Sequence, residues 1–387
     1  MANNRKKILI TGGGTGGHLY PALALARHFR DRLEVVYVGR ADKIEGRVIP
    51  EEKFPFHPLA AVPFTTSPAR LPGFFWHFSR SLVRALRLLL SIRPLLVVGF
   101  GGYVSLPVGL MARLLGIPVA VHEQNMHGGL ANRILVRVGA QAMTTFPGTK
   151  LPPSKRPPIV TGCPVRSDIG SHDKAHARKT LELPSDKKIC LVIGGSGGAK
   201  FINDTLLKVL LLAAHRNDIY FLHVTGPAHL ESTRAALSST LREDLWRGRY
   251  RMEGYISEIA LYYAAADLAI CRGGSATVNE LACAGLPALL VPSPNVTDNH
   301  QEGNARYLQS LGAAEVLLEG SLTPEILLAR IESLLDDPET RASMAANGRA
   351  RALGHQALAK MEEVLRQHCP ALECPPLTDL KGSHVSL

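Results

Sequence analysis

The sequence contains few of the residue patterns that mark metal-binding, disulfide-bonded or membrane-spanning proteins. Its six cysteines form no Cys-x-x-Cys pair and have no histidine cluster near them, which predicts scattered reduced thiols rather than a zinc site or disulfides. It has no Asp-x-Asp pair and no long run of Lys or Arg. The uncharged stretch 94–112 has the length of a membrane span, but its glycines and its proline predict a buried strand, a turn and a helix instead.

Length and charge favour a two-domain globular protein with a phosphate-rich partner. The 387 residues are 46% hydrophobic and 20% charged, which is typical of soluble proteins with a substantial core. The net charge of +11 is spread along the chain, and this favours an anionic lipid surface or a diphosphate substrate over nucleic acid. The first apolar run is very short and is followed by glycines, unlike a signal peptide.

Two distant stretches share one pattern, KKILITGGGTGGH at 6–18 and KKICLVIGGSGGAK at 187–200. Each is an apolar run followed by a glycine cluster and a helix-like segment, which predicts a strand, a tight turn and the start of a helix. The unpaired N–H groups at such a helix start favour an anionic group such as a phosphate. Strand and helix patterns alternate after both stretches, so we expect two Rossmann-like, doubly wound α/β domains that face a cleft.

The first glycine cluster also matches a dinucleotide-binding fingerprint. Gly12, Gly14 and Gly17 have the G-x-G-x-x-G spacing, which is weak evidence by itself. An NAD site needs an acidic residue at the end of the second strand, where this chain has Gly39 and Arg40. Because an arginine there suits a 2′-phosphate, an NADP oxidoreductase remains an alternative.

An aromatic and basic segment follows a long predicted loop over 54–73. Arg80, Arg84 and Arg87 share one face of a helix predicted over 81–92, and the aromatic cluster at 74–78 stands at its start. Two interpretations remain open. The segment is either a packed helix with a solvated arginine edge, or a patch whose aromatic residues enter an anionic membrane surface.

Polar clusters follow predicted strands in both halves, at the place where open α/β sheets bind ligands. In the first half, HEQN at 122–125 is either a buried polar turn or a substrate contact. In the second half, a turn over 272–277 precedes a helix predicted over 278–284, and its N–H and hydroxyl groups suit a phosphate. Glu280 either completes a capping box or holds the two hydroxyls of a ribose.

These motifs occur together, and in the same order, in one known family. The chain resembles it through GGGTGGH at 12–18, GFGGYVSLP at 99–107, HEQN at 122–125, GCPVR at 162–166, GGSGGAK at 194–200, CRGGSATVNELACAGLPALLVP at 271–292 and DNHQ at 298–301. The family is that of the UDP-N-acetylglucosamine transferases of bacterial peptidoglycan synthesis, the MurG family of glycosyltransferase family 28. The resemblance implies the glycosyltransferase B fold and transfer of N-acetylglucosamine to lipid I, giving lipid II. It implies no cofactor, and a peripheral location on the cytoplasmic face of the cell membrane, with an anionic membrane surface as a partner.

The resemblance also implies how the chain is divided. Residues 1–165 form an N-terminal Rossmann-like domain that binds the acceptor and faces the membrane, and 166–345 form a C-terminal Rossmann-like domain that binds UDP-N-acetylglucosamine. A helix over 346–368 crosses back to the first domain. For the tail over 369–387 the resemblance implies nothing, and its polar, proline-containing composition predicts disorder. Two places depart from the family pattern. Gly197 stands where the family usually has glutamine, and the helix opening at Ser275 and Ala276 also varies, although its residues are small.

Site roles follow from the same resemblance. Donor binding is implied for Thr15, Gly16, Gly17, Arg166, Ser196, Ile256, Ser275, Ala276, Thr277, Glu280, His300 and Gln301. Acceptor binding is implied for Gly13, Gly14, Tyr103, His122, Glu123 and Asn125, with Thr15 also beside the acceptor. Glu280 is expected to hold the ribose, Ser196 and the helix start the diphosphate, Ile256 the uracil, and His300 with Gln301 the sugar hydroxyls.

The implied reaction is a single displacement with inversion at the anomeric carbon. His18 is the candidate general base for the position-four hydroxyl of the muramyl sugar, because an ordinary histidine can accept a proton near neutral pH. A role in binding the acceptor diphosphate is the alternative for His18. No metal site is expected, since the helix start would meet the charge of the leaving UDP. Other functions left open are a UDP-N-acetylglucosamine epimerase, a non-catalytic nucleotide-sugar-binding subunit and a glycosyltransferase with another glycolipid acceptor.

Overall fold

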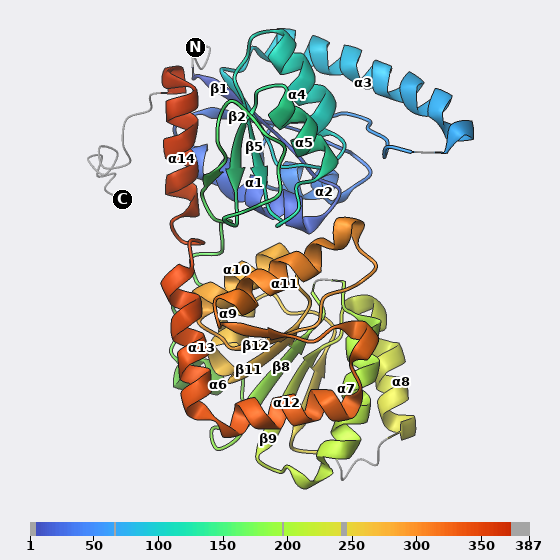
Figure 1. The fold of residues 1–387 in the computed structure, drawn as a ribbon, viewed down its shortest axis with the longest axis vertical. Coiled ribbons are helices and arrows are strands. Elements are labelled where there is room, and N and C mark those ends of the chain that lie inside the picture. The colour runs from blue at the N-terminus through green and yellow to red at the C-terminus, as the bar shows by residue number, and fades with distance from the viewer. Residues whose placement is uncertain (1–4, 66, 196, 241–245, 373–387) are drawn as a thin grey trace, which may run out of the picture. The chain divides into compact units, whose positions relative to one another are not determined.

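The computed structural model describes residues 5–65, 67–195, 197–240 and 246–372. The described chain divides into two compact units. Unit 1 contains the residues up to Pro164 together with those from Gln356 onward, and unit 2 contains Val165–His355. Each unit is a parallel sheet covered by helices (Figure 1). The predicted fold class, two doubly wound α/β domains, is therefore confirmed.

Unit 1 is built on a seven-stranded sheet in the order β3-β2-β1-β4-β5-β6-β7, with every strand pair parallel. Its strands are β1 (Lys7–Thr11), β2 (Glu34–Gly39), β3 (Phe56–Pro58), β4 (Leu96–Gly99), β5 (Val119–Glu123), β6 (Gln141–Thr144) and β7 (Ile159–Val160). Its helices are α1 (Gly16–Phe29), α2 (Ile44–Glu51), α3 (Leu71–Ile92), α4 (Ser105–Leu114), α5 (Leu130–Arg137) and α14 (Ala357–His368).

Both faces of the first sheet are buried, which explains the continuous apolar runs in its strands. Side chains alternate between the faces along β1, so Ile8 and Ile10 lie in one hydrophobic cluster and Leu9 lies in the other. Helices α1, α2 and α14 supply the first cluster, whereas α3, α4 and α5 supply the second. The last helix of the chain thus completes the core of the first unit.

Unit 2 repeats this plan with a six-stranded parallel sheet in the order β10-β9-β8-β11-β12-β13. Its strands are β8 (Lys188–Ile193), β9 (Ile219–Val224), β10 (Tyr250–Glu253), β11 (Leu268–Cys271), β12 (Ala288–Leu290) and β13 (Ala314–Val316). Its helices are α6 (Lys174–Thr180), α7 (Lys200–Leu212), α8 (Leu230–Thr240), α9 (Ile259–Ala265), α10 (Ser275–Ala284), α11 (His300–Ser310), α12 (Pro324–Asp336) and α13 (Pro338–Arg351).

The uncharged stretch 94–112 forms β4 and most of α4, as predicted. Within the described ranges, no helix is long and apolar enough to cross a membrane. The loop predicted over 54–73 is partly wrong, because it contains β3 and the first residues of α3. Helix α3 begins at Leu71, well before Ser81, because a proline at position 72 is tolerated in the first turn of a helix. The aromatic cluster therefore lies within the helix.

The single helix predicted over 346–368 is two helices. Residues up to Arg351 finish α13 in unit 2, and α14 starts at Ala357 in unit 1. The break contains Gly354, where a Cβ atom would lie 2.7 Å from the Cys283 sulfur, so the chain passes too close for a larger residue. Most of the predicted disordered tail lies outside the described residues. Its first part is ordered, because Cys369 and Leu372 are buried in the unit 1 core.

One carboxylate attaches α14 to the rest of unit 1. Glu362 accepts hydrogen bonds from Arg32 at 2.6 and 2.9 Å, lies 2.6 Å from the Nε2 atom of His28 and is also bonded by Arg366. The side chain of Arg32 is only 3% exposed. Burial raises the pKa of Glu362, but the hydrogen bonds from Arg32 and His28 outweigh it and lower the pKa to about 2. Glu362 is therefore the ionised partner of a buried arginine.

Replacing Glu362 should loosen α14. Glu362→Ala leaves Arg32 buried without its counter-ion, which should cost about 3 kcal/mol. We expect hydrogen exchange of the α14 amides to accelerate roughly a hundredfold, since about 1.4 kcal/mol corresponds to tenfold. The wild-type protein should lose the same stabilisation as the pH falls from about 4.5 towards about 2, because the carboxylate is then protonated.

The neighbouring Glu363 provides the control. It is exposed, and its side chain is bonded only weakly, by Gln367 at 3.3 Å. Glu363→Ala should leave exchange in α14 nearly unchanged. Equal acceleration in both variants would show that the Glu362 network does not hold the helix.

Candidate functional site

The predicted site residues of unit 1 lie at the carboxyl edge of its sheet. The loops after β1, β4 and β5 begin at neighbouring strands, because β4 pairs with both β1 and β5. The first loop carries Gly13, Gly14 and Thr15 and leads into α1, whose first three residues are Gly16, Gly17 and His18. The second loop carries Tyr103, and the third carries Asn125. The structure thus brings the candidate base and the predicted acceptor residues to one edge.

Glycine permits the first two loops to pack backbone against backbone. A Cβ atom at Gly102, whose φ is +78°, would lie 2.6 Å from the carbonyl oxygen of Gly13. A Cβ atom at Gly12 would lie 2.9 Å from the Cβ atom of Phe100. Side chains at these positions would separate the two loops, so this close approach fixes the position of the α1 start that carries His18.

A residue that the sequence analysis missed, Glu45, fills the anion position of the first loop. This buried carboxylate at the start of α2 accepts hydrogen bonds from the Gly14 amide at 3.1 and 3.0 Å and from the Arg40 amide at 3.2 Å. A pyrophosphate would need the same glycine amide and would meet a negative charge there. The geometry of this loop therefore argues against the NADP-binding alternative. An acidic residue in the first turn of the helix after β2 was the available signal.

The side chains of His18, Gln124 and His122 form a chain of hydrogen bonds. The Nδ1 atom of His18 lies 3.0 Å from Oε1 of Gln124, and Nε2 of Gln124 lies 3.2 Å from Nδ1 of His122. The Nε2 atom of His122 lies 2.9 Å from the carbonyl oxygen of Gly162. His122 is fully buried, and this burial lowers its pKa to about 4, so its ring is neutral near pH 7.

Glu123 is also buried, and it organises the loop after β5. One oxygen accepts the Asn125 amide at 3.0 Å, and the other accepts the Gly129 amide at 2.9 Å and the Asn132 side chain at 2.8 Å. His122 and Glu123 therefore form the buried polar turn that was one of the two interpretations of HEQN. Asn125 is partly buried and Tyr103 is 47% exposed, so both remain accessible to a ligand.

Most predicted donor residues in unit 2 lie at the carboxyl edge of its sheet. They follow β10, β11 and β12, and the glycine loop after β8 lies at the same edge. Ser196 is outside the described residues. A Cβ atom built on Gly197 meets no atom within 4 Å, so the first side-chain atom of a larger residue would have room there. Crowding does not explain why glycine stands there.

Helix α10 begins at Ser275, which is earlier than predicted. Gly274 precedes it with extended backbone and has no side chain to cap the helix, and the first turn contains no acidic residue. The N–H groups from Ser275 to Thr277 are therefore the start of a helix that favours an anion. Because Thr277 lies inside the helix, Glu280 is not part of a capping box, and that alternative is wrong.

Glu280 instead points into a polar group formed with neighbouring elements. Its Oε2 atom accepts a hydrogen bond of 3.0 Å from the Tyr263 hydroxyl. Burial raises its pKa to about 7, while the Tyr263 bond and the Arg166 charge act in the opposite direction. Glu280 is therefore close to half ionised near neutral pH, and ligand hydrogen bonds to the carboxylate would favour its charged form.

The guanidinium group of Arg166 is bonded to other groups of the protein. It donates to both oxygens of Asp168, at 3.0 and 2.6 Å, and to the carbonyl oxygen of Ser257 at 2.7 Å. Ser257 follows Ile256, whose main chain was predicted to meet the uracil. The geometry therefore gives Arg166 the role of holding the 254–258 loop.

The start of α11 is fixed beside the α10 turn. A Cβ atom at Gly273 would lie 2.2 Å from the Gln301 carbonyl oxygen, and Asn304, which the sequence analysis missed, donates to the Gly273 carbonyl at 3.1 Å. The Gln301 Oε1 atom accepts the Ser293 amide at 2.9 Å, which leaves its NH₂ group to donate to a ligand. Nδ1 of His300 lies 2.7 Å from the Thr297 carbonyl, so Nε2 of the neutral ring is the acceptor.

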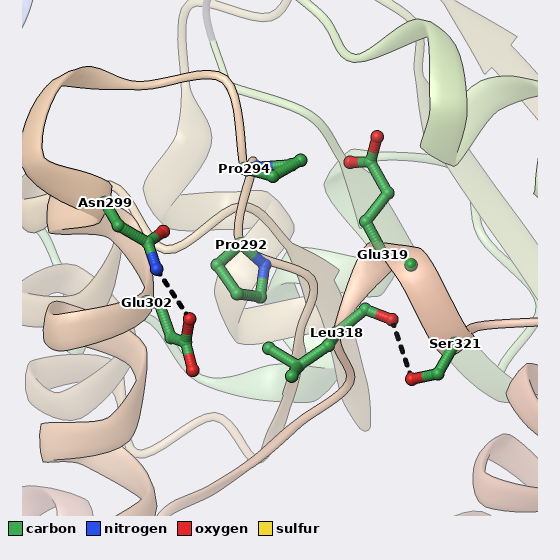
Figure 2. A pocket seen from close by; sticks show the side chains of 8 residues that line it. Pro292, Pro294, Asn299, Glu302, Leu318, Glu319 and Ser321 are labelled. Carbon is green, nitrogen blue, oxygen red and sulfur yellow. Dashed lines mark hydrogen bonds between the residues drawn. The ribbon is translucent and has the colours of Figure 1, made fainter.

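A pocket of about 510 Å³ is lined partly by the segment between β12 and α11. Figure 2 shows Pro292, Pro294 and Leu318 in its wall, together with Asn299, Glu302 and Glu319. Asn299 donates to Glu302 at 2.7 Å, and Glu319 pairs with Arg272. None of the predicted donor residues lines this pocket. Across the described ranges, no group of three or more His, Cys, Asp or Glu residues could hold a metal ion.

Comparison with known proteins matches both halves of the chain to one family. The model of the glycosyltransferase family 28 N-terminal domain matches residues 8–144, and that of the C-terminal domain matches residues 189–360. Among similar sequences are the UDP-N-acetylglucosamine–N-acetylmuramyl-(pentapeptide) pyrophosphoryl-undecaprenol N-acetylglucosamine transferases of Desulforudis audaxviator and Desulfitobacterium hafniense. The first is 38% identical over 90% of this chain and 95% of its own length, and the second is 39% identical over 92% and 98%.

Solved structures agree with this match. The crystal structure of Acinetobacter baumannii MurG has a TM-score of 0.76 and 28% identity, and covers 93% of this chain and 99% of its own. A putative UDP-N-acetylglucosamine 2-epimerase from Listeria monocytogenes has a TM-score of 0.66 and 14% identity, and covers 95% and 97%. The likeness to the epimerase shows the fold alone.

Proposed function

The chain belongs to glycosyltransferase family 28, and we propose that it transfers N-acetylglucosamine from UDP-N-acetylglucosamine to lipid I, giving lipid II for peptidoglycan synthesis. The observation that carries this function is the identity of 38–39% with transferases of that name over about nine tenths of both chains. The acceptor is undecaprenyl-pyrophosphoryl-N-acetylmuramyl-pentapeptide, and the enzyme is an N-acetylglucosaminyltransferase.

We assign donor binding to the carboxyl edge of unit 2. The α10 start would hold the diphosphate, because its N–H groups and helix dipole favour negative charge. Glu280 would accept hydrogen bonds from the ribose hydroxyls, and the main chain near Ile256 would meet the uracil. The Gln301 NH₂ group and the His300 Nε2 atom would bind sugar hydroxyls, one as a donor and the other as an acceptor.

His18 is the proposed general base. The position-four oxygen of the muramyl sugar attacks the anomeric carbon of the donor sugar, and its proton passes to the imidazole of His18. The bond from the anomeric carbon to the β-phosphate oxygen breaks in the same step, with inversion, and the electron pair leaves on UDP. The α10 start stabilises the charge that develops on the diphosphate.

We propose that α3 attaches the protein to the cytoplasmic face of the membrane as a peripheral protein. No residue of its first ten is buried, and Figure 1 shows this part of α3 extending away from the sheet of unit 1. Phe75 and Trp76 are 59% and 63% exposed, and the exposed Arg80 lies over the Trp76 ring. Aromatic side chains beside arginines suit the headgroup layer of an anionic membrane.

The function is tested by following UDP release from UDP-N-acetylglucosamine with and without a soluble lipid I analogue. Release should require the analogue. His18→Ala should lower kcat by a factor of roughly 10²–10⁴, the usual contribution of a general base, and leave donor affinity unchanged. His57→Ala on the edge strand β3 serves as the control and should keep its activity. Release without acceptor would point to an epimerase or hydrolase, and full turnover by His18→Ala would remove His18 as the base.

Donor binding should depend on pH through Glu280. Because the pKa of Glu280 is raised to about 7, its ionised fraction grows between about pH 6 and 8, and charged acceptors make stronger hydrogen bonds. Calorimetry should therefore show tighter binding of UDP-N-acetylglucosamine at the higher pH. Its diphosphate does not titrate in this range, unlike that of free UDP.

Glu280→Gln should abolish that pH dependence and weaken binding by about tenfold, the value of one charged hydrogen bond. Tyr262→Phe is the matched control for the neighbouring Tyr–Glu pair, since Tyr262 donates to Glu253 and not to Glu280. A pH dependence that survives in Glu280→Gln would assign it to another group.

Membrane attachment is tested by substituting Phe75 and Trp76 together with serine. Binding to vesicles that contain anionic phospholipid should weaken at least tenfold, because two exposed aromatic side chains no longer enter the bilayer surface. Turnover with a soluble acceptor should not change. Serine at Leu211 and Leu212 of α7, which are 38% and 41% exposed, is the control. Equal vesicle binding by all three proteins would contradict the assignment of α3.

A further inference from the structure

The buried histidine of unit 1 has only one neutral form that fits its surroundings. The His122 Nε2 atom lies 2.9 Å from the carbonyl oxygen of Gly162. A carbonyl oxygen can only accept, so Nε2 carries the proton. Complete burial keeps the ring neutral, and Nδ1 of His122 is therefore an acceptor.

This acceptor fixes the orientation of the Gln124 amide. The Gln124 NH₂ group lies 3.2 Å from the His122 Nδ1 atom and 3.2 Å from the His122 carbonyl oxygen. Turning the amide over would place its oxygen against two acceptors inside the protein, which leaves buried groups unpaired. The Gln124 oxygen must therefore face the other way, towards His18.

The orientation of Gln124 in turn decides the proton position on His18. Oε1 of Gln124 lies 3.0 Å from Nδ1 of His18 and can only accept. A Cβ atom at Gly101 would lie 3.2 Å from the same Nδ1 atom and 3.1 Å from Cε1, so this edge of the ring is enclosed by the chain. Which nitrogen of a neutral histidine carries the proton is set by such a bond.

We propose that Gln124 is a positioning residue that holds neutral His18 in the Nδ1–H form, so that Nε2 is the atom that accepts the proton of the sugar hydroxyl. The proposal rests on the base role given to His18 above and deepens it. Gln124 does not touch the reacting atoms. It transmits to His18 the proton arrangement that the Gly162 carbonyl imposes on buried His122.

Three linked side chains fix the His18 tautomer more firmly than a single hydrogen bond would. A single carbonyl acceptor beside His18 would give the same tautomer with fewer groups. Here the Gln124 amide joins two imidazoles, with its NH₂ group towards His122 and its oxygen towards His18. Moving the proton to the other nitrogen of either ring would therefore require the amide to turn over and the other ring to change its tautomer as well. These linked hydrogen bonds therefore keep the Gln124 amide in one orientation, whereas an isolated glutamine amide could turn over.

The tautomer can be measured directly. In protein labelled with ¹⁵N-histidine, long-range ¹H–¹⁵N spectra distinguish a protonated ring nitrogen from an unprotonated one, and the His18→Ala variant identifies the His18 signals. At about pH 8, where ordinary imidazole side chains are neutral, wild-type His18 should show a protonated Nδ1 and an unprotonated Nε2. A proton mainly on Nε2 would overturn the proposal.

Two substitutions of Gln124 separate tautomer control from packing. Gln124→Leu removes the acceptor, so His18 should shift towards the Nε2–H form. In Gln124→Glu, a protonated carboxyl group can donate to His122 Nδ1 and accept from His18 Nδ1–H, so the wild-type tautomer should be kept. Gln141→Leu is the control, because Gln141 is also a buried glutamine of unit 1 with two hydrogen bonds but does not contact His18. An unchanged His18 tautomer in Gln124→Leu would overturn the proposal.

Kinetics complete the test. Gln124→Leu should lower kcat about tenfold, less than the loss of the base itself, with little change in KM for the donor. Wild-type kcat in Gln124→Leu, alongside an inactive His18→Ala, would overturn the proposal. Full turnover by His18→Ala would instead defeat the base role proposed above, and the spectra would still report whether Gln124 sets the tautomer.

Discussion

Close backbone approach at glycine is the constraint on which both units depend. In unit 1 the Gly102 position meets the Gly13 carbonyl, and in unit 2 the Gly273 position meets the Gln301 carbonyl. Both contacts join loops from the carboxyl edge of a parallel sheet, where a ligand site is expected. Side chains at these glycines would push the loops apart. The positions of His18, of the α10 start and of the α11 start are consequences of these contacts.

Loops made of glycine leave polar backbone groups that the chain must satisfy. Unit 1 uses its own carboxylates for this purpose, since Glu45 accepts the Gly14 amide and Glu123 accepts the amides of Asn125 and Gly129. At α10 no acidic residue occupies the first turn, and Gly274 offers no cap. The same succession of strand, glycine turn and helix therefore has a loop amide bonded by a carboxylate in unit 1, whereas the first turn of α10 in unit 2 contains no acidic residue. Under the proposed function, this difference separates a structural use of the pattern from a ligand-binding one.

The sequence predicts the fold well because buried parallel strands read as continuous apolar runs, as in β1 and β8. Glycine clusters then locate the loops that matter. The start of α10 could not be predicted, because Ser275 and Ala276 suit both a turn and a first helical turn. The bond from the Gly14 amide to Glu45 was not predicted, because it depends on the direction in which α2 leaves the sheet. The break between α13 and α14 depends on a contact between Gly354 and Cys283, which are far apart in the sequence.

Histidines show most clearly what sequence alone cannot decide. His122 and His223 are buried with both ring nitrogens bonded, His223 to Tyr250 at 2.8 Å and to Asn203 at 3.0 Å. Burial lowers the pKa of His223 to about 3, so both rings are neutral structural links. His18 and His300 each have Nδ1 bonded by the protein, which leaves Nε2 for a ligand. Of these four histidines, only His18 and His300 therefore have a ring nitrogen to which the structure gives no protein partner, and that difference is set by three-dimensional neighbours such as Gln124.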